Sequence, residues 1–145
     1  MSNVHRFLSL TPAVQRRYVR AFLIVAGVRI GLSIVPFSRF QALLVRFTPS
    51  SGRRSAAPTR AQLAHEVRVV SCVVPSATCL TQAIAGQILL GHYGYPAVVH
   101  FGVAKDEGEG AFQAHAWLES DGRVVIGESE QLYVPLARLG DTARM

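Results

Sequence analysis

Apolar residues in the first quarter of the chain recur every three to four positions, which is the spacing of one face of an α-helix. The positions that carry this repeat, with one arginine among them, are Tyr18, Phe22, Val25, Arg29 and Leu32. The pattern predicts a helix over residues 11–33. Thr11 supplies a hydroxyl N-cap, Pro12 suits the first helical position, and Pro36 ends the helix. A shorter helix is expected over residues 38–46, so that the two form a helical hairpin with apolar faces inward and arginines outward.

Two further helices are predicted in the middle of the chain, over residues 59–73 and residues 78–92. The segment that precedes them, residues 48–58, is rich in Pro, Ser and Gly, which is typical of a flexible link. We therefore divide the chain into a basic N-terminal hairpin with its linker, residues 1–58, and a core, residues 59–145. The two parts are expected to pack as one compact unit.

After residue 95 the pattern changes to Val-rich and aromatic runs separated by turn residues, which indicates β-strands. The expected strands cover residues 96–104, 111–119 and 123–127, with a last strand or turn of helix at residues 132–139. An acidic, Gly-rich loop at residues 105–110 would join the first two strands, and Asp121-Gly122 would form the next hairpin turn. Helices followed by an antiparallel meander indicate an α+β fold.

Charge is distributed unevenly along the chain. Residues 1–60 contain ten arginines and no Asp or Glu, whereas the remainder contains four Arg and one Lys against nine acids; the parts carry +10 and −4, which sum to the net +6. A basic region of this kind can meet nucleic acid, anionic lipid or an acidic protein, or can simply be solvated. We expect a protein or peptide partner ahead of lipid, and no nucleic acid.

The apolar run over residues 21–35 is too short to span a bilayer. It has 15 residues and contains Arg29, whereas about 20 apolar residues are needed. A buried or interfacial helix is therefore expected, and no signal peptide is evident before it. The two cysteines, Cys72 and Cys79, form neither a disulfide framework nor a CxxC pair. Reduced thiols fit a cytoplasmic protein, with peripheral membrane contact through the N-terminal helices left open.

Cys79 and His115 are the residues that most clearly suggest chemistry. Cys79 is expected in the first turn of a helix, where the helix dipole and a nearby imidazolium would lower the pKa of a thiol. The unpaired N–H groups of that turn could hold an oxyanion. His115 lies on a predicted strand and could act as the base. From this context alone, burial of each residue in the core is the favoured interpretation, and the spacing does not overturn it.

No metal or cofactor site is predicted. The remaining histidines show no ligand spacing with the cysteines, and the glycines at residues 86, 91 and 94 do not form a nucleotide-binding fingerprint because no strand precedes them.

A third residue should orient the imidazole of His115. If Asp121-Gly122 form a two-residue turn, paired residues have numbers that sum to 243, and His115 then faces Glu128 across the hairpin. A bulge would shift this pairing by one. Asp121 is the alternative third member, although it lies far along the strand from His115.

Several motifs together resemble the transglutaminase-like cysteine protease family of lasso-peptide maturation, in its stand-alone leader-peptidase form. They are Thr78-Cys79-Leu80 opening a helix, Gly94-Tyr95-Pro96-Ala97-Val98-Val99 with Phe101-Gly102-Val103, and Ala114-His115-Ala116-Trp117-Leu118-Glu119 followed by Asp121-Gly122-Arg123. The resemblance implies a papain-like core with Cys79 as nucleophile and His115 as general base. The family usually places an acid about a dozen residues after the histidine, where this chain has Gly127 followed by Glu128.

The resemblance also implies a function, namely removal of the leader from a ribosomally made precursor peptide. Such a peptidase would work with a separate leader-recognition protein and with an ATP-dependent cyclase, to which any nucleotide requirement would belong. The basic N-terminal residues would dock the recognition protein or the leader, or cover the core. Two alternatives remain open: a transglutaminase-like acyl transferase that uses the same residues, and a non-catalytic module that docks a membrane or a partner.

Overall fold

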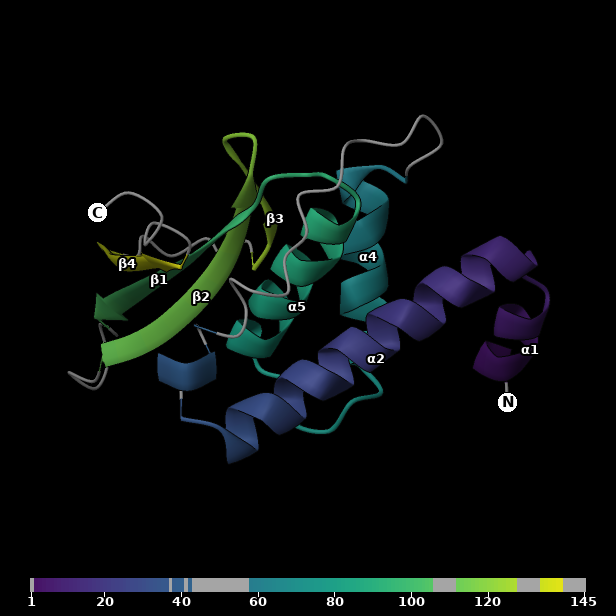
Figure 1. The fold of residues 1–145 in the computed structure, drawn as a ribbon, viewed down its shortest axis with the longest axis horizontal. Helices are drawn as coiled ribbons and strands as arrows, with labels where there is room; N and C mark the ends of the chain where they lie inside the picture. The colour runs from purple at the N-terminus through teal and green to yellow at the C-terminus, as the bar shows by residue number, and fades with distance from the viewer. Residues whose placement is uncertain are drawn as a thin grey trace.

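The computed structural model describes residues 2–36, 38–40, 42, 58–105, 112–127 and 134–139, and every structural statement below concerns these residues. In chain order, the elements are α1 (Ser2–Leu8), α2 (Pro12–Ile34), α4 (Arg60–Ser71), α5 (Cys79–His92), β1 (Val98–Lys105), β2 (Phe112–Ser120), β3 (Arg123–Ile126) and β4 (Val134–Leu139). The helix α5 lies between the sheet and the long helix α2, with α4 beside both helices (Figure 1). This arrangement confirms the predicted α+β fold.

The helices begin and end close to where their capping residues predicted. The helix α2 ends at Ile34, two residues before Pro36, because proline disfavours helical conformation in the residue before it. At the start of α4 the Thr59 hydroxyl accepts from Gln62 N while the Gln62 side chain accepts from Thr59 N, which is a complete capping box. The short helix α1 was not predicted. Of the expected helix at 38–46, residues 38–40 and 42 are helical, and the rest of it and nearly all of the linker lie outside the described residues.

The four strands form an antiparallel sheet in the order β3-β2-β1-β4. The first three strands make the predicted meander. The turn at Asp121-Gly122 has positive φ at both residues, +56° and +74°, as a tight two-residue hairpin turn requires. The simple meander is wrong for β4, which crosses back to pair with β1 instead of continuing beside β3. A period-2 pattern identifies a strand but does not say which edge of the sheet it joins.

The core between α5 and the sheet depends on a close approach at Gly86. A Cβ at this position would lie 2.5 Å from Ile126 Cδ1 and 2.8 Å from Leu118 Cδ2. Both of these side chains are almost fully buried, at 2% and 0% exposed. The missing side chain at Gly86 therefore lets the backbone of α5 lie directly against β2 and β3, which fixes the height of the helix above the strand that carries His115.

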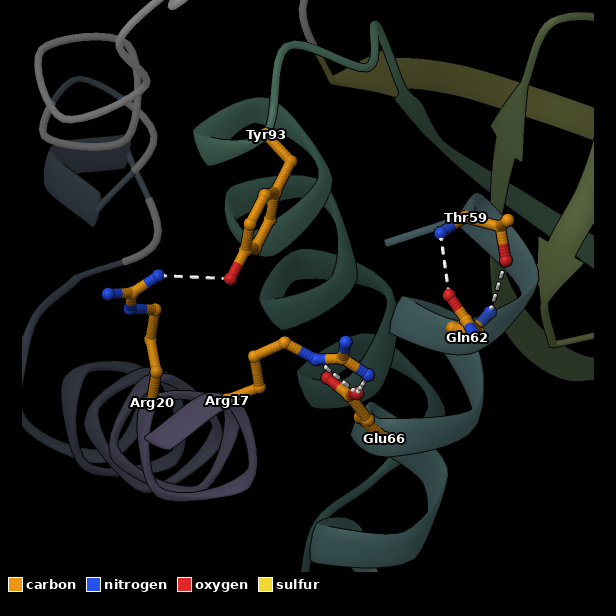
Figure 2. Close-up of polar contacts among 6 residues, drawn as sticks. All are labelled: Arg17, Arg20, Thr59, Gln62, Glu66 and Tyr93. Carbon is orange, nitrogen blue, oxygen red and sulfur yellow. Dashed lines mark hydrogen bonds and ion pairs between the residues drawn. The ribbon is translucent and has the colours of Figure 1, made fainter. Parts of the chain in front are cut away.

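The prediction that the N-terminal arginines point outward is wrong for Arg17, whereas Arg20 is exposed as expected. Arg17 on α2 donates to the Glu66 carboxylate on α4 through Nε, at 2.9 Å, and through Nη2 (Figure 2). Arg20 donates to the Tyr93 hydroxyl at 3.0 Å, just beyond the end of α5. The physical reason is that Glu66 is only 2% exposed and so needs a cationic partner inside the structure. The helix α2 is thus packed against α4 and α5 and contributes to the hydrophobic core.

Candidate active site

Cys79 is the first residue of α5, as the sequence predicted. Thr78 is the N-cap, and its hydroxyl accepts from the backbone N–H of Thr81 at 3.3 Å. The N–H groups of Cys79 and Leu80 have no partner within the helix because of their position, so they remain available to an oxyanion. The thiol is not in a disulfide and is half-buried. Its location combines the positive end of the helix dipole with partial access to substrate.

A pocket of about 380 Å³ opens beside this first turn. One side is lined by the C-terminal part of α2 and its C-cap, with Arg29, Leu32 and Val35. The other side is lined by residues around the start of α5, namely Ser76, Thr78, Leu80 and Thr81. Ser76 adopts a φ of +59° in the loop that leads into the helix. The pocket mixes apolar and hydroxyl-bearing side chains with one guanidinium, a lining that suits a segment of peptide beside the first turn of α5, although Cys79 itself does not line it.

His115 lies on β2 opposite Gly102 of β1, and the contacts that hold its ring include a hydrogen bond and a stacked ring. Its Nε2 lies 2.7 Å from the backbone carbonyl oxygen of Gly127. Its ring stacks on Trp117, with 6.2 Å between ring centroids and 20° between planes. Trp117 stacks in turn on His100, whose Nε2 lies 3.3 Å from a carboxylate oxygen of Glu119. The ring of His115 therefore ends a row of stacked rings along one face of the sheet.

Cys79 and His115 lie toward the same end of the α5–β2 pair. The chain just beyond the C-terminal end of α5 meets the end of β2, where the Ser120 hydroxyl donates to Pro96 O at 2.6 Å, and Gly86 meets Leu118. Cys79 lies seven residues before Gly86 on the helix, and His115 lies three residues before Leu118 on the strand. Both offsets correspond to about 10 Å, and Figure 1 shows α5 and β2 starting at the same end of the molecule.

The structure records no direct contact between the two side chains. Ala116 and Leu118 form the face of β2 that is buried toward α5, at 2% and 0% exposed, so His115 alternates onto the other face. The recorded contacts of its ring, with Gly127 and Trp117, lie there and at the strand edge. The structure therefore brings Cys79 and His115 to the same end of the fold without recording a hydrogen bond between their side chains.

The predicted third members have different outcomes. Asp121 lies at the exposed tip of the β2–β3 hairpin, six residues and so about 20 Å along the strand from His115, and the structure does not bring it to the ring. Glu128 lies outside the described residues. The uniform register that placed it opposite His115 is wrong, because a bulge between Leu118 and Glu119 shifts the pairing from Glu119↔Val124 to Leu118↔Ile126.

The contact that sequence reasoning missed is the backbone carbonyl of Gly127. A search for acidic side chains in the sequence could not identify this contact, because the hydrogen-bond acceptor is a backbone carbonyl oxygen, which every residue has. The available signal was the glycine itself, at the end of a predicted strand and a dozen residues after His115. Its φ is +83°, a conformation that glycine adopts without strain.

In the part of the chain that the structure describes, no group of three or more His, Cys, Asp or Glu side chains is placed to hold a metal ion. Within the same residues, no helix combines the length and the apolar character needed to cross a bilayer.

The fold and this site agree with a family comparison. The model of the transglutaminase-like superfamily matches residues 22–138, which are 117 of the 145 residues. The chain therefore belongs to the transglutaminase-like superfamily. Searches of curated proteins and of solved structures found no match. Membership suggests cysteine peptidase or acyl transferase activity, since the superfamily generally includes cysteine proteases with Cys-His-Asp catalysis.

Proposed function

We propose that this protein is the leader peptidase of a lasso-peptide pathway, with Cys79 as nucleophile and His115 as general base. The observation that carries the proposal is a half-buried free thiol at the first position of a capped helix, at the same end of the fold as a histidine held by a hydrogen bond. The superfamily match supports cysteine chemistry, and the resemblance of the Thr78-Cys79-Leu80 and His115-Ala116-Trp117 motifs supports the particular substrate.

The reaction proceeds in two halves. His115 takes the proton of Cys79, and the thiolate attacks the carbonyl carbon of the scissile peptide bond. The resulting oxyanion is held by backbone N–H groups of the first turn of α5, which point at it without reorganisation. His115 then gives its proton to the leaving amine of the core peptide, leaving the leader as a thioester on Cys79. Water, deprotonated by His115, hydrolyses the thioester and frees the thiol.

The same residues could transfer the acyl group to an amine, and product masses separate the two reactions. We expect that the protein, mixed with its precursor, the recognition protein and an added primary amine, releases a leader whose mass is that of the fragment plus one water. Mass spectrometry of the leader fragment measures this directly. A leader carrying the added amine in place of water would instead establish an acyl transferase.

We also propose that the separate recognition protein docks on the outer face of α2. This face carries an apolar stripe at helical spacing, whose members are Val19 (49% exposed), Leu23 (64%), Ile30 (58%) and Ile34 (75%). A helix that is apolar on both faces normally has both covered. Because residues 1–60 contain ten arginines and no acid, the complementary partner is an apolar surface with acidic side chains around it. The cyclase and the precursor would join the same assembly.

The stripe can be tested with a double variant, Leu23→Ser with Ile30→Ser. We expect the dissociation constant for the recognition protein to rise at least about 10-fold, because apolar contacts at the centre of an interface dominate its affinity. Isothermal titration calorimetry measures it, and Val73→Ser, which alters an equally exposed valine at 68% beyond the end of α4, is the matched control. An unchanged constant contradicts the proposal. If the double variant instead loses binding to vesicles of anionic lipid, the face docks a membrane.

A further inference from the structure

We infer that the backbone carbonyl of Gly127 positions the ring of His115 for proton transfer, at the nitrogen where a Cys-His-Asp enzyme uses a carboxylate. The inference rests on the proposed role of His115 as a base and names the group that holds it. Gly127 acts through His115 and does not touch the reacting atoms, so it is a positioning residue.

The 2.7 Å contact between His115 Nε2 and Gly127 O fixes where the ring carries its proton. A carbonyl oxygen can only accept a hydrogen bond, so Nε2 must be the donor. In the neutral ring the lone pair is then on Nδ1, and Nδ1 is the nitrogen that receives the proton of the thiol. When the ring becomes an imidazolium, Nε2 keeps its proton and the hydrogen bond to the carbonyl becomes charge-assisted and stronger.

Two features keep the ring and the carbonyl in register. Trp117 stacks on the ring of His115 with planes 20° apart, which restricts rotation of the ring out of the line to Gly127. The bulge between Leu118 and Glu119 shifts the β2–β3 pairing by one residue immediately before Gly127. Bulges redirect a strand locally, and this one brings the backbone of Gly127 beside Ala116 and Trp117.

The position requires glycine because of both its conformation and its surroundings. Gly127 has φ +83°, and a Cβ there would lie 2.8 Å from the Ala116 carbonyl oxygen and 3.1 Å from Trp117 Cα. These neighbours are backbone atoms that cannot turn aside as a side chain can. Any larger residue must therefore push the backbone of residue 127 away from β2, and its carbonyl away from His115.

The test compares Gly127→Ala with Glu128→Gln, the variant that removes the carboxylate expected from the sequence. A matched control is Gly122→Ala, because Gly122 also has a positive φ, +74°, but a Cβ there meets nothing within 4 Å. All three are made in the full chain with Cys72→Ser, so that Cys79 is the one remaining thiol. The measurements are ¹⁵N NMR of the histidine ring nitrogens and the rate of Cys79 alkylation by iodoacetamide near neutral pH.

We expect NMR of the parent to show His115 with its proton on Nε2. Gly127→Ala should lose this signature and slow alkylation by at least about 10-fold, since in the proposed function the Cys79 thiolate forms by proton transfer to His115. Gly122→Ala should retain the signature, with a rate within about 3-fold of the parent, since Gly122 makes no contact with the ring. If the carbonyl of Gly127 is the group that positions the ring, Glu128→Gln should also retain the signature and a rate within about 3-fold of the parent.

Three results would overturn the inference: a parent ring protonated on Nδ1, a loss of 10-fold or more in Glu128→Gln with the fold intact, or an equal loss in Gly122→Ala. If Gly127→Ala does not fold, the parent spectrum and Glu128→Gln still decide. Failure of the proposed function gives a different result. Cys79 of the parent would then be alkylated no faster than a free thiol, while ¹⁵N NMR would still report the tautomer of His115.

Discussion

Replacing Cys79 by alanine is expected to lower the rate of leader cleavage by about 10³-fold or more. The thiolate is the atom that bonds to the scissile carbonyl carbon, and neither His115 nor the backbone N–H groups of α5 can replace it. The fold should survive, because the residue is half-buried at a helix start whose cap comes from the Thr78 side chain. Mass spectrometry of the precursor after incubation with the recognition protein measures the rate, and thermal unfolding checks the fold.

Cys72→Ala is the matched control for this experiment. The Cys72 thiol is exposed and lies just after the end of α4, and it does not line the pocket beside the first turn of α5. Its removal should leave the cleavage rate within about 2-fold of the parent, as expected for an exposed residue. If Cys79→Ala cleaves as fast as the parent, Cys79 is not the nucleophile and the thiol is a packing residue.

Replacing Arg17 by alanine is expected to destabilise the fold by about 3–5 kcal/mol. The Glu66 carboxylate is 2% exposed, and its Oε2 has no hydrogen-bond partner among the described residues, so Arg17 provides its recorded ionic contact. Removing the guanidinium leaves a buried charge uncompensated. The expected loss is a large fraction of the roughly 5–15 kcal/mol free energy of unfolding that is typical of a folded domain. Urea denaturation followed by circular dichroism gives the change in the free energy of unfolding.

Arg16→Ala controls for the loss of one positive charge from α2, because Arg16 is exposed, and it should change the free energy of unfolding by less than about 0.5 kcal/mol. The double variant Arg17→Met with Glu66→Leu should recover most of the loss, since apolar side chains of similar size can replace a buried ion pair. A small effect of Arg17→Ala, matching that of Arg16→Ala, would mean that water reaches the Glu66 carboxylate.

Local signals in the sequence were enough to place most of the elements and to put Cys79 at the start of a helix. A hydroxyl before an apolar repeat determines a helix start through hydrogen bonds within four residues, so Thr59 and Thr78 could be identified without the fold. The Asp121-Gly122 turn is equally local. Cys79 was placed correctly at a helix start because Thr78 caps that helix.

The features that the sequence did not reveal depend on contacts between distant segments. The Arg17–Glu66 pair joins residues 49 positions apart, and an arginine on a helix gives no sign of which carboxylate it will meet. The pairing of β4 with β1 is a choice between two sheet edges. The bulge at Leu118 and Glu119 shifts the β2–β3 pairing by one residue, which a uniform register does not anticipate. The hydrogen bond of the His115 ring goes to a backbone carbonyl, which no side-chain pattern in the sequence marks.

The Arg17–Glu66 pair also bears on how far the chain can be shortened without losing stability. The family match begins at residue 22, five residues after Arg17. A chain trimmed to the matched segment would keep the thiol, the histidine and the sheet, but it would leave Glu66 with a buried charge and no counter-ion. The family match therefore begins inside α2, more than one turn after Arg17, and a shortened protein that keeps the ion pair on an intact helix should begin before Pro12.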